Sequence, residues 1–330
     1  MKSTQKFPRR AAIHLVEELD IETLPPGTHR LRLELGEDGT SAPIRAPVHV
    51  IKGHKPGPVV GITAAIHGNE VNGIPTIHRL YRRLKAEELA GTVVAAAPVN
   101  VPGFLRNQRE YSDGKDLNRL FPGKPDGHES QVYAHAIMQR LVRHFDYLLD
   151  LHTASFGRIN SLYIRADMTR PKAAELARVI SPQIIVHNLG SDGTLRGAAE
   201  DLGICSITVE IGNPQRAQGK LVRDSSAGLR DALEHLGMVT SDEERAPPDT
   251  IECKRSFWLY TDGGGILEVF PSLRDRIEQG QPVAQLINEW GEVHRTYEAP
   301  EAGVVVGMAT NPVAQSGSRI LHLGVEGRVE

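Results

Sequence analysis

The chain has 330 residues, 40% of them hydrophobic and 24% charged, a balance typical of a globular protein and not of a disordered one. Its formal net charge of −3, with Lys and Arg scattered in ones and twos, argues against a nucleic-acid-binding protein, which would normally carry a basic stripe. No window approaches the roughly 18 apolar residues that span a bilayer, so we expect no membrane partner either.

The first residues, Met1–Asp20, contain Arg9 and Arg10 but no apolar stretch long enough for an export signal. The whole chain has only two cysteines, Cys205 and Cys253, which are too few to staple a domain of this size. No Cys-x-x-Cys pair is present. A reducing compartment is the simplest setting, and we expect a cytoplasmic protein.

A hairpin is expected at residues 28–51, where apolar and polar side chains alternate around the turn-like segment Gly36–Gly39. From residue 58, apolar runs alternate with segments of helical periodicity. The expected strands are 58–66, 92–99, 146–151, 159–165, 183–187 and 204–210, and the expected helices are 71–86, 129–145, 171–180, 194–202 and 217–236. Because buried strands separated by helices favour parallel pairing, we expect an α/β fold whose mainly parallel sheet is covered on both faces.

The character of the chain changes near residue 250. Residues 240–250 are polar and contain Pro247 and Pro248, as expected of a linker. Beyond them, short apolar stretches are separated by glycine, proline and charged turns, which predicts a compact all-β domain; these stretches are 257–260, 265–270, 282–287 and 303–307. We therefore expect one domain at 1–240, with the β extension at 28–51, and a C-terminal β-rich domain at 251–330.

Two histidines stand at the carboxyl ends of expected strands, which is where ligands bind in parallel sheets. In the segment His67–Glu70 (HGNE), an imidazole and a carboxylate three positions apart can face a common point. His152 follows the apolar strand 147–151. These three side chains could hold a borderline metal such as zinc and leave a fourth position for water, which is the arrangement of a catalytic site.

Either histidine alone is more simply a hydrogen-bonded residue at a strand end, and only the combination with Glu70 favours a metal site. His187 also ends an expected strand and is the nearest rival, but no acidic residue follows it closely. The remaining histidines lie in hairpin, helix-like or turn contexts and are expected to be ordinary; they are His14, His29, His49, His54, His78, His128, His135, His144, His235, His294 and His322.

Glu210 is an acidic residue at the end of an otherwise apolar strand, 204–209. Burying a carboxylate there is costly without a partner or a chemical role. Beside a water molecule activated by a metal ion, it can act as a general base and later as a general acid to a leaving amine. The alternative is a salt-bridged carboxylate at the edge of the sheet.

The loop at 100–125 is long and polar, and such loops within compact domains are usually functional. Asn118 and Arg119 offer a neutral donor and a planar guanidinium that together match a carboxylate. Arg109 could stabilise the oxyanion of a tetrahedral intermediate. For any single arginine a solvated surface charge is the simpler interpretation, and it is the clustering that favours a site.

Four motifs, in this order, resemble those of the succinylglutamate desuccinylase/aspartoacylase family of zinc carboxypeptidase-like hydrolases. They are His67–Glu70 (HGNE), Asp116–Arg119 (DLNR), Asp150–His152 (DLH) and Val209–Gly212 (VEIG). The resemblance covers the chain from about residue 28 to its end. It implies a zinc-carboxypeptidase-like fold, with a mainly parallel or mixed sheet flanked by helices, and the C-terminal all-β domain of these enzymes.

The resemblance also implies residue roles. His67, Glu70 and His152 match the ligands of one Zn²⁺ per chain, and Glu210 matches the catalytic glutamate. The remaining matches concern the substrate. Asn118 and Arg119 match the pair that binds its carboxylate, and Arg196 matches an arginine that contacts its side-chain acid. Arg109 matches the arginine that stabilises the oxyanion, with Arg106 as a rival because the spacing to the DLNR motif is longer than in aspartoacylase.

Together the motifs predict hydrolysis of the amide bond of a small N-acyl amino acid or a related N-acyl compound. One alternative is a metallocarboxypeptidase acting on peptide C-termini, which a pocket roofed by the C-terminal domain would exclude. Another is a non-catalytic metal-binding homologue, against which the full set of ligands and Glu210 argue. No Gly-x-Ser-x-Gly elbow and no phosphate-binding P-loop motif occurs, which disfavours a serine esterase and a nucleotide enzyme. A homo-oligomer stays open.

Overall fold

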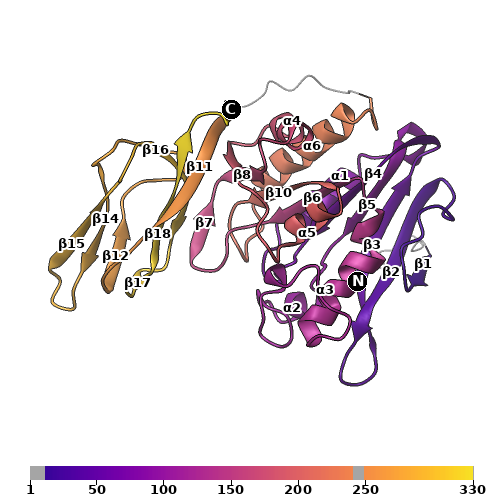
Figure 1. The fold of residues 1–330 in the computed structure, drawn as a ribbon, viewed down its shortest axis with the longest axis horizontal. Coiled ribbons are helices and arrows are strands. Elements are labelled where there is room, and N and C mark those ends of the chain that lie inside the picture. The colour runs from indigo at the N-terminus through magenta and orange to yellow at the C-terminus, as the bar shows by residue number, and fades with distance from the viewer. Residues whose placement is uncertain (1–11, 241–248, 330) are drawn as a thin grey trace, which may run out of the picture.

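The computed structural model describes residues 12–240 and 249–329, which form one 14-stranded mixed sheet and one 4-stranded antiparallel sheet (Figure 1). Most of the expected linker, 241–248, and residues 1–11, which include Arg9 and Arg10, lie outside the described residues. In the described part of the chain no helix is long and apolar enough to cross a membrane. The expectation of a large sheet flanked by helices is confirmed, and the sheet is mixed.

The predicted hairpin is present at one end of the large sheet. Strands β2 (Gly27–Glu37) and β3 (Pro43–Lys52) pair antiparallel, and β3 also pairs antiparallel with β5 (Ala90–Ala96). A short edge strand that the sequence did not predict, β1 (Ile13–Val16), pairs parallel with β2. Only four residues long and largely exposed, β1 carries too little apolar pattern to be recognised.

Four parallel strands form the centre of the sheet, in the order β5-β4-β6-β10. Their apolar side chains are buried because helices cover both faces. The three strands beside β5 are β4 (Lys55–Ala64), β6 (Tyr147–His152) and β10 (Cys205–Ile211). Since these strands run in the same direction, their carboxyl ends meet at one edge, and this edge carries the polar residues described below.

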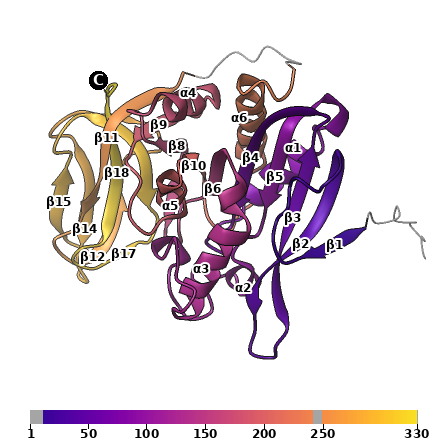
Figure 2. The same ribbon diagram turned by 45° about the vertical axis from the view of Figure 1, so that its right-hand side comes forward.

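The helices divide between the two faces of the sheet (Figures 1 and 2). One core joins the sheet to α1 (Gly73–Tyr81), α4 (Pro171–Val179) and α6 (Gly219–His235). The other core joins it to α3 (Glu129–Arg140) and α5 (Leu195–Asp201). The structured segments between them include α2 (Val101–Leu105) and the 3₁₀ turns η1 (Ala86–Glu88), η2 (Leu117–Arg119) and η3 (Val142–His144).

Two expected elements are divided differently in the structure. The strand predicted at 159–165 is two strands, β7 (Arg158–Asn160) and β8 (Leu162–Ala166). The break is at Ser161, whose backbone N–H and hydroxyl both donate to the carbonyl of Val306 at 3.0 Å. The predicted loop 100–125 contains α2 and η2, and the helices predicted at 71–86 and 129–145 end earlier, at Tyr81 and Arg140.

The C-terminal strands lie at the end of the large sheet away from the hairpin, as both views show. β9 (Ile184–His187) pairs parallel with β11 (Ile251–Tyr260), so the large sheet continues into this region. The other strands of this end are β18 (Arg319–Glu326), β16 (Gly303–Ala309) and β13 (Arg276–Ile277). The second sheet contains β12 (Gly265–Val269), β14 (Pro282–Ile287), β15 (Val293–Glu298) and β17 (Val313–Ala314). The domain division near residue 250 stays a prediction.

Candidate metal centre

The loop that follows β4 carries the first two candidate ligands. The backbone N–H of Glu70 donates to the carbonyl of His67 at 3.0 Å, and this turn brings both side chains to the same side. Gly68 lies between them, and a Cβ there would come within 2.0 Å of the backbone of Gly103 in α2. Asn100 ties the loop to α2, because its side chain donates to the carbonyl of Ile66 and accepts from the N–H of Gly103.

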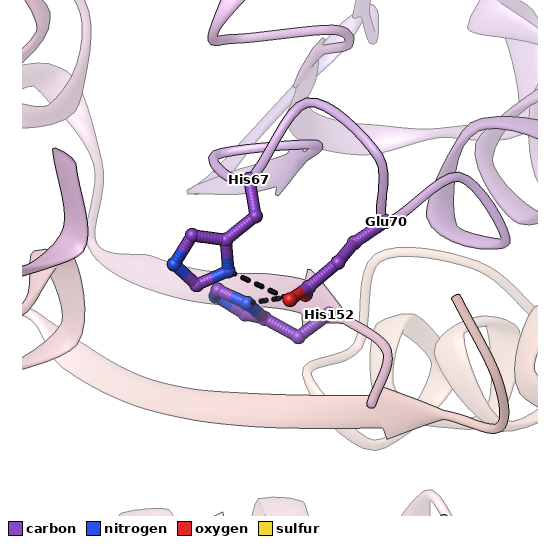
Figure 3. A group of neighbouring side chains, drawn as sticks. All are labelled: His67, Glu70 and His152. Atoms are coloured by element: carbon purple, nitrogen blue, oxygen red, sulfur yellow. Dashed lines mark hydrogen bonds and ion pairs between the residues drawn. The ribbon is translucent and has the colours of Figure 1, made fainter. Parts of the chain in front are cut away.

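His67, Glu70 and His152 meet in a buried group, with His152 coming from the end of β6 (Figure 3). Their ligand atoms all lie within 4.8 Å of one another. His67 Nδ1 lies 2.9 Å from Glu70 Oε1, and His152 Nδ1 lies 3.1 Å from Glu70 Oε2. Both imidazoles therefore turn the same nitrogen, Nδ1, toward the carboxylate.

The far nitrogen of each histidine is held by a further carboxylate. His67 Nε2 lies 3.0 Å from Asp116 Oδ1, and His152 Nε2 lies 2.7 Å from Asp150 Oδ2. The other oxygen of Asp150 accepts a hydrogen bond from Thr63 Oγ1 at 2.7 Å. Carboxylates in this position orient metal-binding histidines and set which nitrogen faces the ion.

An unpartnered nitrogen of His67 also indicates that these residues fit a metal ion. His67 Nδ1 is buried and has no hydrogen-bond partner within the described residues, although Glu70 Oε1 lies 2.9 Å from it. An unpartnered buried nitrogen is costly unless a ligand satisfies it. Two imidazole nitrogens and a carboxylate are a donor set that suits zinc and leaves room for a fourth ligand.

The charges of the group are strongly coupled. Burial alone would raise the pKa of Glu70, but the charge of His67 and the hydrogen bond with His152 lower it well below its usual value. Burial would lower the pKa of His152, but Asp150 and Glu70 raise it well above the usual value. The site therefore favours an ionised carboxylate and positive charge beside it, as a cation-binding group should.

Glu210 lies beside this group. It is directly opposite His152 in the parallel register of β10 and β6, and it is only 6% exposed. One carboxylate oxygen accepts from Asn160 Nδ2 at 3.2 Å, and the other lies 3.4 Å from Arg165 Nη2. Neither of these partners was predicted from the sequence. Asn160 belongs to β7, which the sequence did not separate from β8.

Arg109 is held by the candidate metal group from the side of the loop 100–125. Its Nη1 donates to Glu70 Oε1 at 2.8 Å and to Ser155 Oγ at 2.5 Å. Its Nε and Nη2 donate to Asp116 Oδ2 at 3.2 and 2.9 Å. These bonds use four of the five N–H donors of a guanidinium, so one Nη2 hydrogen is left for a ligand.

The other predicted substrate residues line the same pocket, of about 440 Å³. Asn118 Oδ1 accepts from the N–H of Leu195 at 2.8 Å, which leaves its amide N–H₂ group as the donor. Arg196 is 4% exposed, and its Nη2 donates to the side chain of Asn188 at 2.7 Å. Its Nη1 is buried without a hydrogen bond in the described part of the chain. Arg119 also lines the pocket.

Arg106 lies outside this pocket. Its Nη1 donates to the carbonyl of Ser112, and its side chain lines a separate groove beside β1 and α2. His187 is outside as well and accepts from the backbone N–H of Met168. Sequence reasoning missed two residues from the C-terminal strands that line the pocket, Trp258 on β11 and Arg319 on β18. No local pattern marks them, because they reach the site only through the pairing of distant strands.

Comparison with known proteins gives a consistent result. Residues 56–236 match the family model of the succinylglutamate desuccinylase/aspartoacylase catalytic domain. The chain is 27% identical over 293 residues to an N-alpha-acetyl-L-2,4-diaminobutyric acid deacetylase of Halomonas elongata, covering 83% of this chain and 84% of that one. It is 32% identical over 198 residues to a succinylglutamate desuccinylase of Pseudomonas paraeruginosa, covering 56% of this chain and 58% of that one.

The fold is shared with solved structures. The crystal structure of a succinylglutamate desuccinylase/aspartoacylase from Rhodobacter sphaeroides superposes with a TM-score of 0.85 at 23% identity, covering 95% of this chain and 100% of that one. At this level of identity the superposition supports the fold alone. It spans the C-terminal strands as well as the larger part of the chain.

Proposed function

Because this chain belongs to the succinylglutamate desuccinylase/aspartoacylase family, we propose that it is a zinc-dependent deacylase that hydrolyses the amide bond of a small N-acyl amino acid. One observation carries the proposal: the buried group of His67, Glu70 and His152 shares a pocket with Glu210, which pairs with His152 across β10 and β6. Metal ligands next to a free acid–base residue are what amide hydrolysis by water requires.

His67, Glu70 and His152 would hold one zinc ion per chain, with Asp116 and Asp150 orienting the two imidazoles. When bound, zinc supplies a Lewis acid that polarises the amide carbonyl and makes a water molecule more acidic. The protein residues around it do the remaining work.

Glu210 is the residue that moves the proton. Its carboxylate takes a proton from the water whose oxygen adds to the carbonyl carbon, and passes it to the amine nitrogen as the C–N bond breaks. The products are a carboxylate and an amine. Asn160 and Arg165 hold the Glu210 side chain in the pocket, at 3.2 and 3.4 Å. The remaining N–H of Arg109 can donate to the oxyanion that forms on the former carbonyl oxygen.

Asn118 and Arg119 bind a carboxylate of the substrate in this proposal. Asn118 has its amide donors free for a ligand, and Arg119 has no carboxylate within 4.0 Å in the described ranges. Arg196, with a buried unpartnered Nη1 in the same pocket, is a further donor for an acidic group on the substrate. A planar guanidinium is well suited to a bidentate contact with a carboxylate.

The pocket argues against the metallocarboxypeptidase alternative. Its volume of about 440 Å³ is in the range of small-molecule sites, and Trp258 and Arg319 of the C-terminal strands line it. A long peptide would have to pass these side chains. The intact set of ligands and Glu210 likewise favours an enzyme over a non-catalytic homologue.

The substrate class can be tested by parallel kinetics on an N-acyl amino acid and its primary amide. Loss of the carboxylate should lower kcat/KM, because it weakens the binding of the transition state by about 1.5–3 kcal/mol, the range for hydrogen bonds to charged groups. Arg119→Lys should lower kcat/KM for the acid, since a point charge cannot reproduce the planar fork. Equal kcat/KM for acid and amide would remove the proposed role of Asn118 and Arg119.

A further inference from the structure

Arg165, which lies beside Glu210 in the pocket, shares its strand face with a buried tyrosine. Tyr163 and Arg165 are two positions apart on β8, so their side chains point to the same face of the strand. In the antiparallel register of β8 and β10, Tyr163 lies directly opposite Glu210. Residues directly opposite each other share a face of the sheet. Tyr163, Arg165 and Glu210 are therefore neighbours on one face.

The three side chains form a chain of polar contacts. The phenol oxygen of Tyr163 accepts two hydrogen bonds from Arg165, one from Nε at 2.9 Å and one from Nη2 at 2.5 Å. The same Nη2 lies 3.4 Å from Glu210 Oε1. Because Nη2 carries two hydrogens, one can point to the phenol and the other to the carboxylate. Tyr163 thus reaches Glu210 through Arg165.

The ring of Tyr163 is fixed by a small apolar core at the C-terminal end of the large sheet. Its side chain is fully buried, with neighbours from β9, β11 and β16. These neighbours are Ile184, Val186, Cys253, Val304 and Val306. Burial raises the pKa of the phenol well above its usual value, so the hydroxyl is neutral at pH 7. The phenol oxygen is therefore a fixed acceptor for a guanidinium that stands on a long and flexible side chain.

Tyr163 and Arg165 differ in their access to a substrate. Arg165 lines the pocket, so a loosely held guanidinium could turn away from Glu210 and toward a bound molecule. Tyr163 is not among the described residues that line the pocket. An effect of its hydroxyl on the reaction would therefore pass through Arg165. A carboxylate that moves a proton has to be held in place by side chains that are themselves held by packing and hydrogen bonds.

We propose that Tyr163 is a positioning residue of the hydrolysis: it tethers Arg165, which in turn holds the carboxylate of Glu210 in the orientation that takes the proton from water. This inference rests on the proposed function and extends it to a residue outside the pocket. A displaced base slows proton transfer, but the side chains that bind the substrate stay where they are. The effect of losing the tether should therefore fall on kcat and not on KM.

Tyr163→Phe removes the phenol oxygen and keeps the ring. Its kcat should fall about 10-fold or more, as expected for the loss of hydrogen bonds to a charged group, while KM stays close to that of the wild type. Tyr81→Phe is the matched control. The Tyr81 hydroxyl also makes two hydrogen bonds, to the carbonyls of His49 and Val93, but Tyr81 ends α1 and does not line the pocket. This variant should keep the kcat of the wild type.

A double-mutant cycle tests whether Tyr163 acts through Arg165. Arg165→Met should lower kcat at least as much as Tyr163→Phe does, and adding Tyr163→Phe to it should change kcat little further. Losses that multiply in the double variant would show that Tyr163 acts independently of Arg165, and they would overturn the proposal. A Tyr163→Phe variant with the kcat of Tyr81→Phe, or with a loss confined to KM, would overturn it as well.

The tether can be measured apart from catalysis by NMR of the arginine side-chain N–H groups, with the Arg165 signal assigned by its absence in Arg165→Met. The Arg165 Nε–H should exchange with solvent about 10-fold or more faster in Tyr163→Phe, because its acceptor is lost. If no N-acyl amino acid is hydrolysed but this exchange still accelerates, the proposed function fails and the tether stands. If N-acyl amino acids are hydrolysed and Tyr163→Phe changes neither the exchange nor kcat, the tether fails and the function stands.

Discussion

Glu210 differs from the other carboxylates of the pocket in the partners it has. Glu70 contacts both candidate histidine ligands, and Asp116 contacts His67 and Arg109, whereas among the residues that the structure describes Glu210 is held by Asn160 and Arg165. It therefore lies next to the candidate metal group without belonging to it. This separation is what allows a carboxylate to give and take a proton while the ligands stay in place.

Glu210→Gln should keep the metal and lose turnover. The amide has the same shape but cannot accept the proton, so kcat should fall by about 10²–10⁴-fold or more, the range for general acid–base catalysis. Steady-state kinetics with elemental analysis of the same preparation measures both effects. A near-normal kcat would reassign Glu210 to a structural role, and a loss of zinc would place it among the ligands.

His322 gives a pH dependence to stability. Burial and the nearby arginines lower its pKa from 6.5 to about 3, so the folded protein keeps the neutral form. The stability that comes from the neutral imidazole is fully present above pH 6.5 and is lost as the pH falls toward 3. The reason is that the unfolded chain binds a proton at His322 in this range and the folded chain does not. The free energy of unfolding should lose up to about 1.4 kcal/mol per pH unit from this residue between pH 6 and 4.

Urea unfolding of the wild type and of His322→Gln over this range isolates the effect. The variant should be the less stable at pH 7, and its stability should fall less steeply with acid, so the two curves should converge. Parallel curves would show that His322 has the same pKa in the folded and the unfolded chain, so that burial does not keep its imidazole neutral.

The site residues at strand ends could be predicted from the sequence, whereas the carboxylates that hold the two histidines were not predicted. His67, His152 and Glu210 each follow or end an apolar run, which is a local signal. Asp150 could have been found, since residues two apart on a strand share a face and His152 is two positions further on. Asp116 could not, because its contact with His67 joins residues 49 positions apart in the sequence and depends on the fold.

The loop His67–Glu70, which carries two of the candidate ligands, packs against α2 at Gly68. A Cβ at Gly68 would meet the backbone of Gly103 and Phe104 at 2.0–2.2 Å, so the loop or α2 must move. Gly68→Ala should lower the free energy of unfolding by about 1–3 kcal/mol or more, as overpacking does, and should weaken zinc binding. Gly39→Ala is the control, because nothing lies within 4 Å of its added Cβ.

Urea unfolding and zinc content of the two variants test this contact. If Gly68→Ala and Gly39→Ala behave alike in both measurements, the loop is not held by α2. This contact could not be predicted, since α2 is five residues long and lies in a segment that composition describes only as a polar loop.

Strand directions were the least predictable property of the elements. Apolar runs separated by helices predicted the central parallel strands correctly, because a helix between two strands returns the chain to the same end. β8 is antiparallel to β10 nevertheless, and it follows β7 after the single residue Ser161. No periodicity distinguishes this break from a continuous strand.

For the molecule as a whole, the C-terminal strands complete both the sheet and the pocket. β11 extends the large sheet from β9, and Trp258 and Arg319 come from β11 and β18. The composition change near residue 250 predicted β structure there but could not indicate that it reaches the candidate site. Such contacts depend on pairing between segments far apart in sequence, for which a single chain carries no local pattern.

We propose that amide hydrolysis by this protein depends on a zinc ion held by His67, Glu70 and His152. Its most direct test is amine release from an N-acyl amino acid by metal-stripped protein titrated with zinc. We expect no release without metal and a linear gain in rate that ends at one zinc ion per chain. Equal rates with and without zinc, or no release from any N-acyl amino acid at full zinc occupancy, would contradict it.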